Sequence, residues 1–150
     1  MTYDLNANRI QNRIEKAHNN DINSICYANS YNSNIILSAG DDCLVKVWDK
    51  RSLINNKSVV GKFVGHTEGI TYVTSREDGV YLATNGKDQL LKVWDMRKMI
   101  PAKNFKKVRP IKRLWSFNYM EDEFYYEDPR EVPRHPDDAS VFTFCGHEVL

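Results

Sequence analysis

A histidine, a hydroxyl residue and an aspartate recur together at two places in this chain of 150 residues. The first set is His18, Ser38 and Asp42, and the second is His66, Thr84 and Asp88. These residue types are those of a hydrolase triad, in which an aspartate orients a histidine that takes a proton from a nucleophilic hydroxyl. A catalytic centre has no reason to be copied along the chain, however. The duplication therefore favours a structural role, and we expect no enzymatic activity.

The spacing around two tryptophans repeats as well. The phrase VKVWDKR at residues 45–51 returns 46 residues later as LKVWDMR at residues 91–97. In each copy the hydroxyl residue lies 10 residues before the tryptophan and the aspartate lies 6 before it. The histidines precede Trp48 and Trp94 by 30 and 28 residues. A fixed period of this length indicates a repeat architecture.

Short runs of alternating apolar and polar residues, rich in β-branched and aromatic side chains, fill each repeat, as expected of strands. They cover residues 22–27, 35–38, 44–48, 59–64, 70–74, 80–84 and 90–94. Asn, Asp and Gly residues typical of turns separate them. No helical period is visible. We therefore expect an all-β fold with four antiparallel strands in each repeat.

Such a unit of about 45 residues resembles the WD40 repeat, which forms one blade of a β-propeller. A histidine dipeptide, Ala17-His18 or Gly65-His66, opens each unit, and Trp-Asp closes it. Tyr3-Asp4 matches the Trp-Asp of a preceding blade, and Gly146-His147 matches the opening of a following one. Because a closed ring needs roughly four to eight blades, we expect a propeller fragment of about two complete blades plus the edges of two neighbours.

The repeats predict the domain organisation of this partial propeller, residues 1–150. Residues 1–14 end a preceding blade, 15–64 form the first full repeat, 65–97 and 140–145 form the second, 98–139 are an insertion, and 146–150 start the next repeat. An open arc leaves unpaired strand edges and apolar faces at both ends, which favour association.

In the WD40 family, the triad-like residues form a buried hydrogen-bond chain from the tryptophan indole through the hydroxyl and the imidazole to the aspartate. The resemblance thus implies two tetrads, His18, Ser38, Asp42 and Trp48, and His66, Thr84, Asp88 and Trp94. Such a chain satisfies polar groups whose burial would otherwise cost about 1–3 kcal/mol each.

An arginine follows each Trp-Asp pair. These two boxes are Trp48, Asp49 and Arg51, and Trp94, Asp95 and Arg97. The third strand of each blade should carry its box away from the histidines, so both arginines are expected on one face. A single exposed Asp-Arg pair contributes little to stability and is weak evidence of a function. Asn6 stands at the arginine position after Tyr3-Asp4, so that blade is not expected to contribute.

Two consecutive boxes resemble the substrate receptors of the cullin-4 RING ubiquitin ligase. Over about two thirds of the chain, the sequence resembles the family of WD repeat-containing protein 23. The resemblance is greatest at residues 65–97, GHTEGITYVTSREDGVYLATNGKDQLLKVWDMR. The resemblance implies that Arg51 and Arg97 contact the ligase adaptor, damage-specific DNA-binding protein 1. The expected partners are this adaptor, cullin-4 and an unknown protein substrate. The alternative is a generic WD40 scaffold that assembles a different complex with no role in ubiquitination.

Other classes of site find little support in the sequence. A net charge of +1 gives no long-range field that would attract nucleic acid or a membrane. Cys26, Cys43 and Cys145 are an odd number at wide spacings, as expected of reduced thiols. His135 and His147 lie too far apart for a zinc motif, and no metal or cofactor is expected. The polar first residues favour the cytoplasm, the nucleus or both.

The insertion combines a basic part, residues 103–113, with an acidic aromatic part, residues 121–131. One interpretation is a strap whose aromatic residues pack on the propeller. A second is a partner-binding element near the arginines. A third reads Lys106–Arg109 and Lys112-Arg113 as a nuclear localisation signal.

Overall fold

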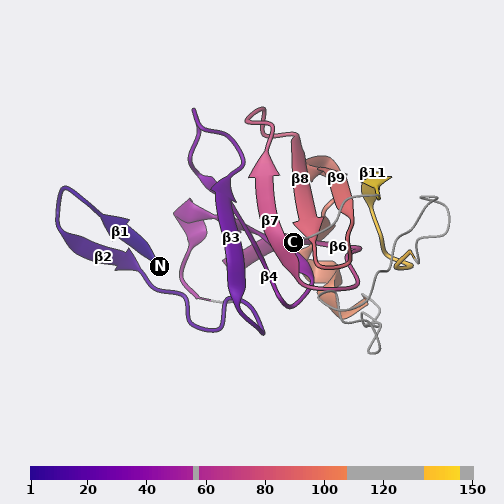
Figure 1. Ribbon diagram of the computed structural model, residues 1–150. Helices are drawn as coiled ribbons and strands as arrows, with labels where there is room; N and C mark the ends of the chain where they lie inside the picture. Colours follow the sequence, from indigo (N-terminus) through magenta and orange to yellow (C-terminus); the bar gives the residue numbers. More distant parts are fainter. Residues whose placement is uncertain (56–57, 108–133, 146–150) are drawn as a thin grey trace.

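The computed structural model describes residues 1–55, 58–107 and 134–145. These residues form β-strands and short 3-10 turns, and none of them lies in an α-helix. Two antiparallel sheets pack against each other, and a two-stranded hairpin precedes them in the chain (Figure 1). The expected all-β class is confirmed.

The first sheet has the strand order β10-β6-β5-β4-β3. Its strands are β3 (Ile22–Tyr27), β4 (Ile35–Gly40), β5 (Leu44–Asp49), β6 (Val59–Val64) and β10 (Ile100–Pro101). Four of them are the strands expected of the first repeat. The fifth, β10, comes from the predicted insertion and pairs with β6 through Ile100 opposite Lys62 and Pro101 opposite Gly61. The insertion thus covers the outer edge of the first blade.

The second sheet has the order β11-β9-β8-β7. Its strands are β7 (Ile70–Ser75), β8 (Tyr81–Gly86), β9 (Leu91–Asp95) and β11 (Ser140–Phe144). β11 follows the insertion and pairs with β9, so the chain returns to complete the blade that it left. The hairpin consists of β1 (Thr2–Asp4) and β2 (Arg9–Asn12), and the 3-10 turns are η1 (Lys50–Ser52), η3 (Met96–Lys98) and η4 (Ala102–Lys107).

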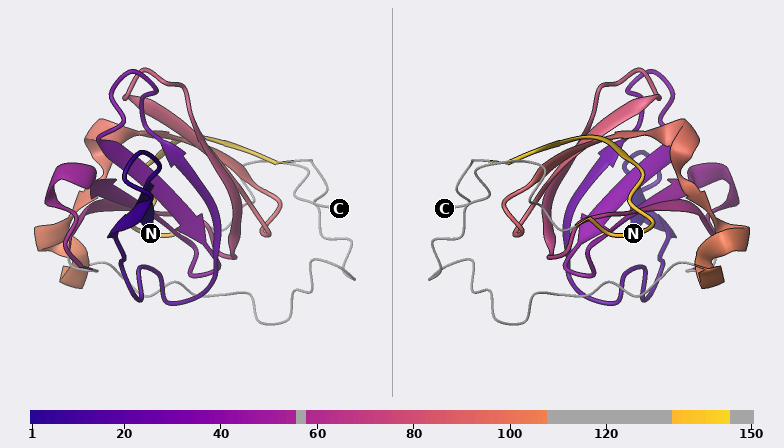
Figure 2. Two further views of the ribbon diagram at one scale, coloured as in Figure 1. Left: turned by 90° about the vertical axis from the view of Figure 1, so that its left-hand side faces the viewer. Right: turned by 90° about the vertical axis from the view of Figure 1, so that its right-hand side faces the viewer.

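The main core lies between the two sheets, where β7 packs against β3 and β4 (Figures 1 and 2). It contains Ala28, Leu37, Ala39, Val45, Val47, Phe63, Ile70, Val73, Leu82 and Trp94. The Phe63 and Trp94 rings meet with their centroids 5.5 Å apart. A second apolar cluster, made of Ile36, Trp48, Leu53 and Val59, lies in the first sheet. Period-two alternation explains this arrangement, because successive side chains of a strand face opposite sides of the sheet.

Several sequence expectations fall wholly or partly outside the described residues. These are the start of the next repeat at 146–150, His147 with it, and the stretch 108–133 of the insertion. Among the cysteines, Cys43 is buried, Cys26 and Cys145 are partly buried, and none of the three is in a disulfide. No helix in the part of the chain that the structure describes is long and apolar enough to cross a membrane.

Candidate functional site

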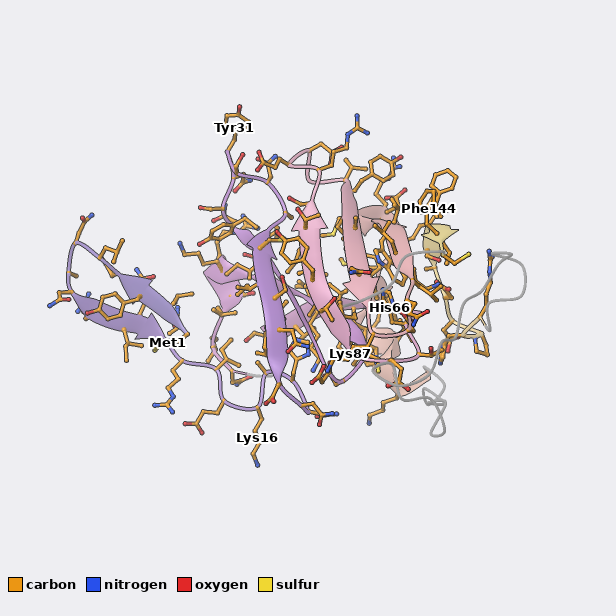
Figure 3. All side chains as sticks on the ribbon, viewed as in Figure 1. Met1, Lys16, Tyr31, His66, Lys87 and Phe144 are labelled. Carbon is orange, nitrogen blue, oxygen red and sulfur yellow. The ribbon has the colours of Figure 1, made fainter. Side chains whose placement is uncertain are left out.

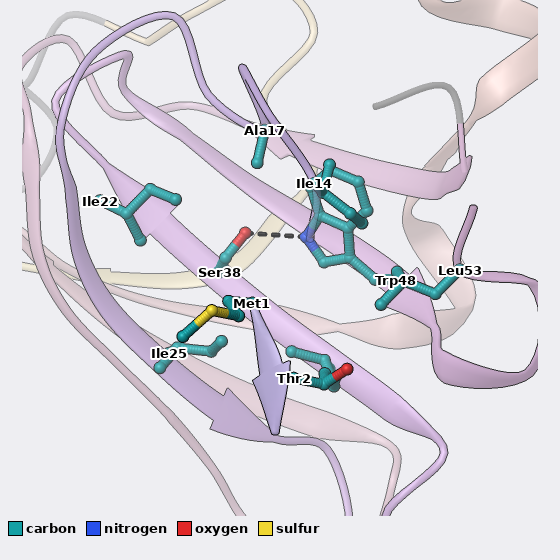
Figure 4. Close-up of a pocket in the computed structure, with 10 residues that line it drawn as sticks. Met1, Thr2, Ile14, Ala17, Ile22, Ile25, Ser38, Trp48 and Leu53 are labelled. Carbon is teal, nitrogen blue, oxygen red and sulfur yellow. Dashed lines mark hydrogen bonds between the residues drawn. The ribbon is translucent and has the colours of Figure 1, made fainter. Parts of the chain in front are cut away.

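The first triad-like set is joined into one buried hydrogen-bond chain. His18, in the segment before β3, has its Nδ1 2.7 Å from Asp42 Oδ1 and its Nε2 2.7 Å from Ser38 Oγ. The indole N–H of Trp48, on β5, donates to the same hydroxyl at 2.8 Å (Figure 4). Strand pairing explains the meeting, because Ser38 on β4 and Trp48 on β5 belong to adjacent strands, and Asp42 lies in the turn that joins them.

The second set repeats this geometry in the second sheet. His66 Nδ1 lies 2.9 Å from Asp88 Oδ2, and its Nε2 lies 2.7 Å from Thr84 Oγ1. The Trp94 indole donates to Thr84 Oγ1 at 2.8 Å. The aspartate also accepts the backbone N–H groups of Thr67 and Leu90, at 3.0 and 3.2 Å. The carboxylate therefore holds the segment that opens the repeat against the turn between β8 and β9.

A small apolar cavity of about 100 Å³ borders the first tetrad (Figure 4). It is lined by Met1, Thr2, Ile14, Ala17, Ile22, Ile25, Ile36, Ser38, Trp48 and Leu53. The Ser38 hydroxyl at its wall already serves both the indole and the imidazole. The second tetrad is similarly buried, with His66 fully buried and Thr84 2% exposed, against 3% for Ser38. The same hydrogen-bond geometry is thus present in both blades.

The two arginines adopt matching conformations at the ends of β5 and β9. Arg51 donates from Nε to Asp49 Oδ1 at 3.0 Å and from a terminal nitrogen to Oδ2 at 2.7 Å. Arg97 makes the same two bonds to Asp95, at 2.9 and 2.7 Å. Each aspartate also accepts the arginine's own backbone N–H at 2.9 Å, which starts a 3-10 turn. The side chains nevertheless remain 71% and 70% exposed.

These bidentate contacts shift the acidity of the carboxylates. The hydrogen bonds from the Arg97 side chain and backbone, together with its charge, lower the pKa of Asp95 to about 2. The corresponding bonds from Arg51 lower the pKa of Asp49. Both boxes therefore carry fully formed ion pairs at neutral pH. Each guanidinium is oriented by its aspartate, and the Arg97 side chain also interacts with Tyr81. Because a guanidinium has five N–H donors, donors remain beyond the two that bind the aspartate.

Both boxes lie at the same end of the molecule. Asp49 pairs with Ile35 at the start of β4, and Asp95 pairs with Tyr81 at the start of β8. The loops that lead into these strands touch each other, because Gly79 donates its N–H to the Ala28 carbonyl at 3.2 Å. Figure 3 shows Tyr31, in the first of these loops, at one end of the sheets and Lys16, just before His18, at the other. The arginines are thus opposite the histidine-bearing segments.

A comparison with models of protein families identifies the family of this chain. The model of the WD domain, G-beta repeat family matches residues 10–49 and 57–95, each ending at the Trp-Asp pair of one sheet. The chain belongs to the WD40 family. Each WD40 unit contains three consecutive strands of one blade, β3 to β5 or β7 to β9, and the second unit begins with β6, the outer strand of the first blade. Together the units form a protein-interaction module.

The relatives of this WD40 chain are longer proteins. It is 42% identical over 149 residues to a DDB1- and CUL4-associated factor 11 homolog from Caenorhabditis briggsae and 40% identical to that from Caenorhabditis elegans. It is 39% identical over 148 residues to a LEC14B homolog from Prunus armeniaca. Each match covers 99% of this chain, so the likeness extends beyond the two thirds expected and includes the insertion. The chain spans 25–30% of the length of these relatives.

Sequence reasoning missed a lysine that is repeated in these WD40 blades. Lys46 on β5 and Lys92 on β9 occupy the same place in VKVW and LKVW, and Lys92 is fully buried. Lys46 donates to the Ala17 carbonyl at 2.8 Å, and its ammonium lies 3.3 Å from Asp42. Lys92 instead donates to Asp138, in the segment that returns from the insertion, at 2.8 Å. A lysine repeated inside an apolar run was the available signal.

No metal centre is indicated in the described ranges 1–55, 58–107 and 134–145, where no group of three or more His, Cys, Asp or Glu residues could hold an ion. His135 is buried, and its Nδ1 accepts the backbone N–H of Asp137 at 3.0 Å.

The first part of the insertion agrees with the strap interpretation, because β10 and η4 pack on the first blade. Most of the predicted nuclear localisation signal lies outside the described residues.

Proposed function

We propose that this protein is a substrate receptor of a cullin-4 RING ubiquitin ligase and docks on the ligase adaptor through Arg51 and Arg97. The observation that carries the proposal is the matched pair of exposed arginines at one end of two consecutive blades. Two relatives that match 99% of the chain are named DDB1- and CUL4-associated factor 11 homologs. The substrate is then a protein held elsewhere on the molecule.

The geometry of the boxes supports a docking role physically. Each guanidinium is already oriented by its aspartate, so little side-chain freedom is lost when a partner binds. The exposed edge still offers several donors for carbonyl or carboxylate acceptors. Arginines of this kind are among the residues that most often dominate the binding energy of an interface.

The alternative is a WD40 scaffold that assembles a different complex. The observation in its favour is that each arginine already has an aspartate partner, as in an ordinary surface ion pair. The scaffold predicts that neither the adaptor nor cullin-4 co-purifies with the protein from cells.

A binding experiment with the protein at its natural length tests the proposal. We expect Arg51→Ala combined with Arg97→Ala to weaken adaptor binding by at least about 30-fold, because interface hot spots contribute about 2 kcal/mol or more. Affinity is measured by titration with purified adaptor, and thermal unfolding reports whether the fold is retained.

The matched control is Arg76→Ala. Arg76 is 73% exposed, lies 3.6 Å from the aspartate two residues later, and occupies a loop at the same end of the molecule as the boxes. Its removal changes the charge equally but should leave adaptor affinity within about twofold, as for a peripheral surface charge. Normal adaptor binding by the folded double variant would refute the docking role.

A further inference from the structure

The segment Met99–Lys106, here called the strap, leads from the second arginine box to the first blade. It begins directly after η3, which contains Arg97. Its first part, β10, pairs with β6 on the outer edge of the first sheet, and its second part, η4, also packs on β6. Figure 2 shows the turns η1 and η4 on the same side of the molecule in both views. The chain therefore links the two boxes a second time, outside the core between the sheets.

Phe105 attaches the strap to the first blade through an apolar and a cation–π contact. Phe105 packs against the apolar cluster that contains Trp48 and Leu53. These two residues lie on either side of Arg51 in the sequence, one at the end of β5 and one just after η1. The Lys62 ammonium lies 4.6 Å from the centre of the Phe105 ring, which holds η4 to β6 by a cation–π contact. Phe105 is therefore part of the apolar packing around the cluster from which the first box extends.

Met99 fixes the other end of the strap. Its side chain packs against the core between the sheets and lies over Gly61 of β6, where a Cβ atom would collide with the Met99 sulfur. The missing side chain at Gly61 thus leaves the space that lets the strap lie close to the sheet. With Met99 and Phe105 both seated, the segment that leaves Arg97 is anchored at two points around the first blade.

We propose that the strap is a positioning element that sets the spacing between Arg51 and Arg97, with Phe105 as its principal anchor. This inference rests on the proposed adaptor docking. A rigid partner can engage both arginines together only if their separation is fixed, since a mobile pair loses conformational entropy on binding. The insertion of this chain would then serve the docking surface as well as the stability of the blade.

Two measurements on the protein at its natural length test the inference. Phe105→Ala should raise amide hydrogen exchange in residues 50–52 and 59–64 in the absence of adaptor, because η1 and β6 lose their support. It should also weaken adaptor binding by about tenfold or more. Gly61→Val, which displaces Met99 and leaves η4 unchanged in sequence, should act in the same direction on both readouts. Phe105→Tyr keeps the ring and should restore both.

A double-variant comparison separates positioning from loss of folded protein. In the Phe105→Ala background, replacement of Arg51 should cost much less affinity than in the wild type, because Arg51 is no longer held in register with Arg97. If Phe105→Ala only lowered the fraction of folded protein, replacement of Arg51 would cost the folded molecules as much adaptor affinity as it does in the wild type. Lys103→Ala, on the exposed surface of the same turn, is the matched control and should alter neither readout.

Failure of the docking proposal can be distinguished from failure of the strap inference. If the double arginine variant binds the adaptor normally, the docking proposal is wrong whatever the exchange data show. If the arginines matter but Phe105→Ala changes neither exchange nor affinity, the strap inference alone is wrong. A loss of affinity in Lys103→Ala equal to that in Phe105→Ala would mean that η4 touches the adaptor directly, and positioning would be refuted.

Discussion

The hydroxyls of Ser38 and Thr84 each serve two buried groups at once. A hydroxyl has one donor and two acceptor sites, so it can accept from the indole and donate to the imidazole Nε2. With Nδ1–H directed at the aspartate, each polar group of the chain then has a partner. Burial alone would raise the pKa of Asp42, but the hydrogen bonds from His18 and from the Asn19 N–H, together with the nearby charge of Lys46, outweigh burial and lower the pKa. The tetrad is therefore a continuous buried hydrogen-bond network.

We expect Thr84→Val to destabilise the protein by about 2–5 kcal/mol, because it leaves the Trp94 indole and the His66 imidazole buried without their shared partner. Urea unfolding of the protein at its natural length, followed by tryptophan fluorescence, measures the change. Thr84→Ser keeps the hydroxyl and should cost less than about 1 kcal/mol. A loss below about 0.5 kcal/mol in Thr84→Val would contradict the role of the network.

At the scale of elements, the two blades differ in how they hold their outer strand. On β6 Lys62 lies opposite Lys46, whereas on β11 Thr143 lies opposite Lys92. Lys92 can therefore donate to Thr143 at 3.1 Å as well as to Asp138. Burial would raise the pKa of Asp138, but the hydrogen bond and charge of Lys92 lower it. This buried ion pair fastens the end of the insertion to the second blade.

Lys92→Met should destabilise the protein by about 3–5 kcal/mol, since it leaves the Asp138 carboxylate buried without a counter-charge. Denaturant unfolding measures the loss, and hydrogen exchange should place it in β11. Lys46→Met is the matched control and should cost less, because the Lys46 side chain is 14% exposed. A double variant that also carries Asp138→Leu should regain part of the stability. Equal costs for the two lysine variants would argue against the fastening role.

The same pair predicts a dependence on pH. The folded-state pKa of Asp138 lies below its ordinary value of 3.8. Its contribution to stability is therefore complete above that value and is lost as the pH falls through the lower folded-state pKa. The stability difference between the wild type and Asp138→Asn should accordingly shrink on acidification below about pH 4.

At the scale of the whole molecule, the described residues leave apolar side chains open on two outer surfaces. Ile22, Ile25 and Tyr27 on β3 are 48%, 66% and 46% exposed. In the second sheet the exposed group is Tyr72, Phe142 and Phe144, at 60%, 61% and 52%. The chain spans 25–30% of the length of its relatives. Exposed apolar surfaces of this kind are typical of interfaces with further protein.

Residues 1–150 expressed as an isolated chain should therefore self-associate in a concentration-dependent way, as analytical ultracentrifugation would show. Ile25→Lys combined with Phe142→Lys should reduce this association, because a charge on each open face opposes stacking. Substitution of the exposed polar residue Thr74, on the same sheet as Phe142, should not. A monomer with a sharp two-state unfolding transition would contradict the prediction.

The repeat, the strands and the two boxes could be predicted from the amino-acid sequence. These depend on local patterns, since period-two alternation, turn residues and a register of 46 residues recur in both copies. The partner of Lys92, the packing of Phe105 and the extension of the first sheet by β10 became visible only in the folded chain. Asp138 lies near the end of the insertion, 46 residues after Lys92, and Phe105 lies 57 residues after Trp48. The insertion occurs in one repeat only, so no period could place its contacts.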